Sequence, residues 1–280
     1  MRPFERLVTF TAFAGCALAA LTARAGDVPN VAVASNLQFA MPEIAAAFKR
    51  ETGFDVRLAF GSSGNFRRQI AEGAPFELFL AADREFVDAL GREHRTVDDG
   101  TVYAIGRLAL FVPTGSPLTA DSGLKDVARA LEDGRLRKFA IANPELAPYG
   151  EAARQVLTRA GLWTAIAPRL VLGENIGQAA QFAASGAAQG GIVAYSLVRA
   201  PTMAGRGSYA LLPATDHEPL VQKMVLLRTA GATARALYDF MQGRTARAIL
   251  ARHGFDVPAP SRAEKVGSIR MRGVAPARGV

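Results

Sequence analysis

The fold is decided by the stretch Val31-Ala32-Val33-Ala34-Ser35-Asn36, where an apolar strand leads directly into a helix. Helical spacing follows over 38–50, with apolar side chains recurring on one side, and Gly53 ends it. The same alternation of strand and helix continues along most of the chain. Repeated strand–helix–strand units build parallel sheets with helices on both faces. The sequence therefore predicts an α/β protein.

The alternation passes through two similar cycles. Strand–helix units over 31–90 are followed by one long apolar strand over 102–112. Further units over 139–194 are followed by extended segments within 209–227 and by a closing helical region over 232–252. Two lobes, each a mostly parallel sheet flanked by helices, fit this order better than one long sheet.

The domain boundaries follow from these two cycles. We expect a discontinuous first lobe made of 27–106 and 217–258, and a second lobe made of 107–216. The chain would cross between the lobes near 104–108 and again near 212–217. Two crossings of this kind are typical of a hinge between closing lobes.

The N-terminus over 1–25 has the pattern of a secretory signal peptide. Arg2 and Arg6 precede an apolar stretch, and Ala23-Arg24-Ala25 is a small-residue cleavage site. This predicts export to the periplasm and a mature chain that begins near Gly26. The single cysteine, Cys16, lies inside the segment, and a lipid anchor at Cys16 is the weaker alternative.

The excess of basic residues is concentrated at the ends of the chain. The net charge is +8, of which 1–25 contributes +2 and a Gly-rich tail over 259–280, expected to be disordered, contributes +4. Only +2 remains for 26–258, so a nucleic-acid-binding function has little support. One cysteine and three scattered histidines exclude a disulfide framework and the usual zinc motifs.

Four junctions between a strand and a helix share small, hydroxyl or amide residues. They lie at Ser35-Asn36, Gly61–Gly64, Pro148–Gly150 and Gly173–Gly177. The first N–H groups of a helix have no partner inside the helix and carry partial positive charge. Several helix starts at one cleft would form an anion site that needs no Lys or Arg. The alternative for each serine is that it only caps its own helix.

Several blocks resemble, in order and spacing, the molybdate-binding proteins of ABC transporters. The resemblance covers about 30–256, and its most specific part is the run from Gln69 to Asp83. The matching blocks are Val33–Asn36, Phe60–Gly64, Gln69–Asp83, Asn143–Gly150, Gly173–Ile176 and Gly191–Ala194.

The resemblance implies a type II periplasmic binding-protein fold and a set of ligand-binding residues. Family members hold the oxyanion through its oxygen atoms, so no side chain coordinates the metal directly. Ser62 is a further candidate, with capping as the alternative. Tyr195, one place beyond the position used by other members, is not expected to bind. The ligand residues carried over by position are Ser35, Asn36, Ser63, Tyr149 and Ile176.

The resemblance further implies a monomeric transport protein that is not an enzyme and needs no cofactor. It would capture molybdate, and also tungstate, and deliver it to an inner-membrane ABC permease. One alternative is the same fold binding another oxyanion, such as sulfate or phosphate. Another is a secreted hydrolase using Ser63, for which no histidine lies nearby in the chain. Asp83 is expected to cap a helix or brace the hinge, since its carboxylate would repel an oxyanion.

Overall fold

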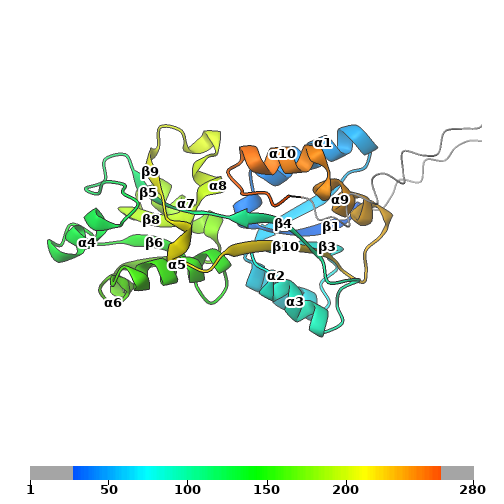
Figure 1. Ribbon diagram of the computed structural model, residues 1–280, viewed down its shortest axis with the longest axis horizontal. Helices are drawn as coiled ribbons and strands as arrows, with labels where there is room; N and C mark the ends of the chain where they lie inside the picture. The colour runs from blue at the N-terminus through cyan, green and yellow to red at the C-terminus, as the bar shows by residue number, and fades with distance from the viewer. Residues whose placement is uncertain (1–27, 260–280) are drawn as a thin grey trace, which may run out of the picture.

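The computed structural model describes residues 28–259, which form two β-sheets side by side, each covered by helices (Figure 1). The expected signal peptide, Cys16 and nearly all of the basic tail lie outside the described residues. Within 28–259, no helix has the length and apolar character needed to cross a membrane.

The first sheet has the strand order β2-β1-β3-β10-β4. The strands β2, β1 and β3 run parallel, whereas β10 is antiparallel to both of its neighbours. The strands of this sheet are β1 (Asn30–Ala34), β2 (Arg57–Gly61), β3 (Leu78–Leu80), β4 (Thr101–Gly106) and β10 (Leu220–Leu226).

Helices cover both faces of this sheet because its strands are apolar on both sides. Helices α1, α9 and α10 share one buried cluster, and α2 and α3 share another on the opposite face (Figure 1). We call this sheet and its helices the first lobe. The helices are η1 (Ser35–Leu37), α1 (Ala40–Thr52), α2 (Ser63–Ala71), α3 (Glu85–Arg92), α9 (Ala232–Gln242) and α10 (Arg244–Arg252).

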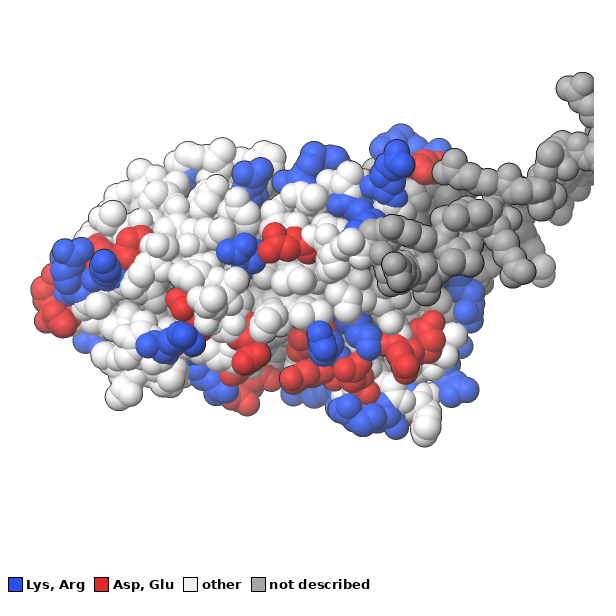
Figure 2. All heavy atoms as spheres, viewed as in Figure 1, with Lys and Arg blue, Asp and Glu red and all other residues white. Residues whose placement is uncertain are grey.

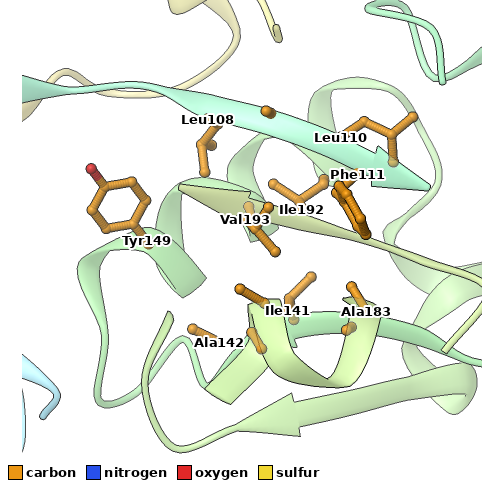
Figure 3. Close-up of a cluster of buried hydrophobic side chains, with 14 of the residues drawn as sticks. Leu108, Leu110, Phe111, Ile141, Ala142, Tyr149, Ala183, Ile192 and Val193 are labelled. Carbon is orange, nitrogen blue, oxygen red and sulfur yellow. The ribbon is translucent and has the colours of Figure 1, made fainter. Parts of the chain in front are cut away.

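The second sheet has the order β7-β6-β8-β5-β9, and with its helices it forms the second lobe. A single apolar cluster fills it, with Phe111, Ile141 and Val193 among its members (Figure 3). Its strands are β5 (Leu108–Pro113), β6 (Phe139–Ala142), β7 (Leu170–Gly173), β8 (Gly190–Ala194) and β9 (Gly207–Leu211). Its helices are α4 (Lys125–Glu132), α5 (Pro148–Arg159), α6 (Trp163–Ile166), η2 (Ala167–Arg169), α7 (Ile176–Ala184), α8 (Tyr195–Val198), η3 (Pro201–Met203) and η4 (Ala214–Asp216).

The predicted two-lobed α/β fold is confirmed, with one refinement of the pairing. In each sheet four of the five strands run in the same direction, and three of these four are direct neighbours in the sheet. The strands that come back from the other lobe, β10 in the first sheet and β5 in the second, pair antiparallel with both neighbours. Each sheet is therefore mostly parallel, as predicted, with one strand that runs in the opposite direction.

The prediction of one long strand over 102–112 is wrong. The segment forms β4, which ends at Gly106, and β5, which begins at Leu108, and the two strands belong to different sheets. Apolar residues continue through the break because each half is buried in its own lobe. Hydrophobic periodicity reports burial and cannot show that a strand changes partners.

Candidate functional site

Ser35 begins the short helix η1, directly after the carboxyl end of β1. Its Oγ accepts a hydrogen bond of 3.1 Å from the backbone N–H of Gly177, which lies in the first turn of α7 in the second lobe. The residue is 4% exposed. Ser35 therefore links the two lobes, and its side chain makes no cap bond to its own helix.

Ser62 and Ser63 have different roles at the start of α2. Ser62 is the N-cap, and its Oγ accepts a bond of 3.3 Å from the backbone N–H of Asn65. Ser63 is the first helical residue, and its Oγ accepts a bond of 2.9 Å from the backbone N–H of Ala82, just beyond β3. The capping interpretation thus describes Ser62, whereas Ser63 is held against a neighbouring strand end.

Tyr149 lies in the first turn of α5, at the margin of the second-lobe core. Figure 3 shows its hydroxyl pointing away from the other labelled side chains of that core. Its Oη accepts hydrogen bonds from Asn36 Nδ2 at 3.3 Å and from Gln222 Nε2 at 2.9 Å. Burial raises the pKa of Tyr149 well above its ordinary value, so the hydroxyl keeps its proton.

Asn36 uses its side-chain amide inside the protein. Besides the bond to Tyr149, its Nδ2 donates to Gln222 Oε1 at 3.0 Å. Its Oδ1 is buried and has no hydrogen-bond partner within residues 28–259. Its backbone carbonyl accepts from Ser196 Oγ at 2.8 Å. The predicted role of Asn36 as a side-chain donor to a ligand is therefore in competition with two internal acceptors.

Ile176 is the first residue of α7, preceded by the N-cap Asn175, whose side chain accepts from Gln178 N–H at 3.0 Å. The backbone N–H of Ile176 is one of the first-turn groups that have no partner inside the helix. The side chain is buried among the apolar residues of the second lobe. The backbone N–H is therefore the only group of Ile176 that could donate to a ligand, and it is the group that the resemblance implies.

The two lobes touch through hydrogen bonds that surround these residues. Gly64 has to be a glycine here, because a Cβ would lie 2.8 Å from the carbonyl oxygen of Leu146. The lobes are therefore in a closed arrangement. The bonds between them include Gly177 N–Ser35 Oγ, Ser196 Oγ–Asn36 O, Asn36 Nδ2–Tyr149 Oη, Gln222 Nε2–Tyr149 Oη, Gly64 N–Leu146 O at 3.0 Å and Asn65 Nδ2–Glu174 Oε1 at 2.5 Å.

Ser35, Ser63 and Tyr149 share one hydrogen-bond pattern, which the N-cap Ser62 shows as well. Ser35, Ser63 and Tyr149 each accept a bond from a protein N–H group, and none donates to an acceptor within residues 28–259. A hydroxyl has a single proton, so each is left able to donate to a ligand. No Lys, Arg, Asp or Glu among the described residues bonds to them. The arrangement can hold an anion by neutral donors.

Two residues of this site, Gln222 and Gly106, are not among the residues that the sequence predicts. Gln222 is fully buried on β10 and contacts both Asn36 and Tyr149. Gly106 ends β4, and a Cβ there would lie 2.2 Å from Tyr149 Oη. One signal was available, because Gln222 is a polar residue on the same face of an apolar strand as Leu220 and Met224.

Two other candidates lie outside the hydroxyl cluster. The ring of Tyr195 packs against Tyr209, with centroids 5.9 Å apart, and beneath Arg199. Asp83 caps α3, as expected, by accepting from Phe86 N–H at 3.2 Å. Burial raises the pKa of Asp83 to about 7, and the nearby Glu85 adds to the shift. Its carboxyl lines a groove with Phe86 and Pro148.

Charged side chains of both signs lie on the face of the molecule shown in Figure 2. On the side shown in Figure 2, basic and acidic side chains alternate and form no large patch of one sign. Within residues 28–259, no group of three His, Cys, Asp or Glu side chains is placed to hold a metal ion.

Comparison with known proteins agrees with this geometry. The model of the bacterial extracellular solute-binding proteins matches residues 29–256. The chain belongs to this family. The solute-binding protein is 38% identical over 244 residues to the molybdate-binding protein ModA of Azotobacter vinelandii, covering 86% of this chain and 94% of that protein. It is also 38% identical to ModA of Rhodobacter capsulatus, covering 84% and 90%.

Solved structures show the same fold. The periplasmic molybdate-binding protein of Azotobacter vinelandii superposes with a TM-score of 0.73 at 32% identity, covering 82% of the solute-binding protein and all of that chain. The sulfate-binding protein SubI of Mycobacterium tuberculosis superposes with a TM-score of 0.67, covering 86% and 90%. At 15% identity, SubI shows the fold alone. The resemblance to molybdate-binding proteins noted in the sequence is confirmed.

Proposed function

We propose that this solute-binding protein captures molybdate between its lobes. The observation that carries the proposal is the set of three buried hydroxyls, Ser35, Ser63 and Tyr149, whose oxygens accept protein hydrogen bonds and whose protons remain to be donated. First-turn N–H groups, such as that of Ile176, add further donors. An oxyanion that offers only acceptors suits such a set.

The three hydroxyl donors suit a dianion, which offers only acceptors, whereas a protonated ligand needs an acceptor in the site. A proton on the ligand would need an acceptor, and Asn36 Oδ1 is the buried acceptor of the site without a partner among the described residues. Phosphate, which carries a proton near neutral pH, is therefore the informative competitor. Sulfate has the charge of molybdate, so discrimination against it has to come from the size of the enclosed site.

In the cell, the protein would deliver molybdate, and tungstate of nearly equal size and charge, to an ABC permease in the inner membrane. It would act there as a monomer, without enzymatic activity, after export through the signal peptide over 1–25. The intact mass of the exported protein tests the export step, and a chain starting at a lipidated Cys16 would contradict it.

Calorimetric titration of the mature protein with molybdate, tungstate, sulfate and phosphate tests the proposal. We expect molybdate and tungstate to bind at least about tenfold more tightly than sulfate, which corresponds to about 1.4 kcal/mol. Equal affinity for sulfate would reject the molybdate assignment while leaving the fold untouched. Tight binding of phosphate would instead mean that Asn36 Oδ1 receives a ligand proton.

A further inference from the structure

Gln222 is a buried polar side chain on the same face of β10 as the apolar residues Leu220 and Met224. It is 0% exposed. The pairing of β10 with β4 shifts beside it, since Gln222 pairs with Ala104 and Lys223 pairs with Val102. Tyr103 is the extra residue of β4 at this bulge. Bulges often redirect side chains next to functional sites.

The amide of Gln222 has a defined polarity. Its Oε1 accepts from Asn36 Nδ2 at 3.0 Å and lies 2.8 Å from the hydroxyl of Tyr103. Its Nε2 donates to Tyr149 Oη at 2.9 Å. The Tyr103 hydroxyl also lies 2.9 Å from Ala81 O, and its single proton can serve only one of these two acceptors. The direction is therefore set by the amides, from Asn36 through Gln222 to Tyr149. At the end of this series, the Tyr149 proton has no acceptor within the described residues.

Gly106 provides the space in which this contact forms. A Cβ at Gly106 would lie 2.2 Å from Tyr149 Oη and 2.6 Å from Gln222 Nε2. The φ of Gly106 is not positive, so its backbone conformation does not require glycine. The close approach of the amide and the hydroxyl does.

We infer that Gln222 is a positioning residue that keeps the Tyr149 hydroxyl as a donor to the bound oxyanion. Gln222 donates to a lone pair of Tyr149 Oη. That lone pair therefore does not face the ligand, and the Tyr149 proton is left to be donated to the oxyanion. Gln222 itself does not touch the anion. The inference rests on the proposed function, because it concerns how the same site binds its ligand.

One other arrangement of the two amides is chemically consistent. If Asn36 and Gln222 were both turned over, Asn36 Oδ1 would accept from Gln222 Nε2, and Gln222 Oε1 would accept the Tyr149 proton. Asn36 Nδ2 would then be the donor to the anion in place of Tyr149. The two arrangements predict opposite effects of substitution at Tyr149 and at Asn36.

A double-mutant cycle with Tyr149→Phe and Gln222→Met tests the inference. Molybdate affinity is measured by calorimetry for the wild type, both single variants and the double variant, and the unfolding midpoint of each is measured without ligand. Tyr149→Phe should weaken binding about tenfold in the wild type, as expected for a hydrogen bond to a charged group. In the Gln222→Met background, the same change should cost less than about twofold.

Tyr238→Phe is the matched control. It removes another buried tyrosine hydroxyl of the first lobe, 2.7 Å from Thr101 Oγ1 and outside the site. We expect it to lower the unfolding midpoint without changing molybdate affinity. If Gln222→Met does not fold, Gln222→Glu takes its place, since an ionised carboxylate of the same shape can only accept and would draw the Tyr149 proton to itself.

The outcomes separate the inference from the proposed function. A wild-type protein that does not bind molybdate contradicts the proposed function. If molybdate binds and Tyr149→Phe has the same effect with and without Gln222, Gln222 has only a structural role and the inference is wrong. If Tyr149→Phe leaves affinity unchanged while Asn36→Ala weakens it tenfold or more, the reversed polarity holds and the inference is also wrong.

Discussion

Ser35 and Ser63 allow the cost of losing a ligand donor to be separated from the cost of losing a contact between lobes. Each hydroxyl can donate one hydrogen bond to the anion, and each accepts one from a backbone N–H group. The partner of Ser35 is Gly177 in the second lobe, whereas the partner of Ser63 is Ala82 in its own lobe. The bond to Gly177 exists only when the lobes are closed.

The magnitudes follow from this difference. Replacing either serine by alanine removes one hydrogen bond to a charged ligand. Such a bond contributes about 1.5–3 kcal/mol, or roughly 10- to 150-fold in affinity. Ser35→Ala also removes a bond of the closed state, worth about 1 kcal/mol, so its affinity should be about fivefold lower than that of Ser63→Ala. Ser63→Ala leaves the buried N–H of Ala82 unpaired in both open and closed states, which should lower the ligand-free unfolding midpoint by about 2–4 °C.

Titration calorimetry of the two variants with molybdate and thermal unfolding of their ligand-free forms measure these quantities. Ser62→Ala is the comparison, because it removes the cap of α2 and tests the capping interpretation of Ser62 against its candidacy as a ligand donor. It should reduce stability by about 1 kcal/mol and change affinity little. The reasoning is refuted if Ser63→Ala weakens binding more than Ser35→Ala, or if Ser62→Ala weakens it as much as either.

Two further predictions concern the groove and the edge of the site. Burial raises the pKa of Asp83 to about 7, so the folded protein binds more protons than the unfolded chain between about pH 4 and 7 and loses stability as the pH rises through that range. Asp83→Asn keeps a capping oxygen and should flatten the dependence of the unfolding midpoint on pH. An unchanged pH profile would contradict this. Asn65→Ala removes the exposed bond to Glu174 between the lobes, so molybdate should dissociate about two- to fivefold faster in stopped-flow experiments, with little change in association. An unchanged dissociation rate would show that the bond does not hold the closed state.

The positions of the site residues could be predicted because local pattern determines them. A strand that ends in Ser35-Asn36 before a helix places those residues at the carboxyl edge of a sheet, whatever the rest of the fold does. The same holds for Ser63 and Ile176. These residues lie at strand ends and in first turns, as the sequence indicated.

The contacts made by Gln222 and Gly106 could not be predicted in this way. Gln222 reaches Tyr149 only because β10 comes back from the second lobe and pairs between β3 and β4. The need for glycine at position 106 arises from a tyrosine 43 residues later in the chain, on another lobe. Such relations depend on register and on lobe closure, which hydrophobic periodicity does not contain. The sequence placed a crossing between the lobes near 104–108, but it did not show that the strand itself breaks after Gly106.

The placement of Gln222 connects ligand binding to the crossing between the lobes. Gln222 is on β10, one of the strands that continue from the segments joining the lobes, whereas Tyr149 belongs to the second-lobe core. Separating the lobes should therefore break the bonds of Tyr149 to Asn36 and to Gln222, together with that of Ser35 to Gly177. Each neutral bond contributes only about 0.5–1.5 kcal/mol, because water replaces the lost partner on opening. The anion is held by such donors, and no fixed cation would bind it in both the open and the closed arrangement. It therefore loses many of its hydrogen-bond donors when the lobes separate, so opening itself would release it.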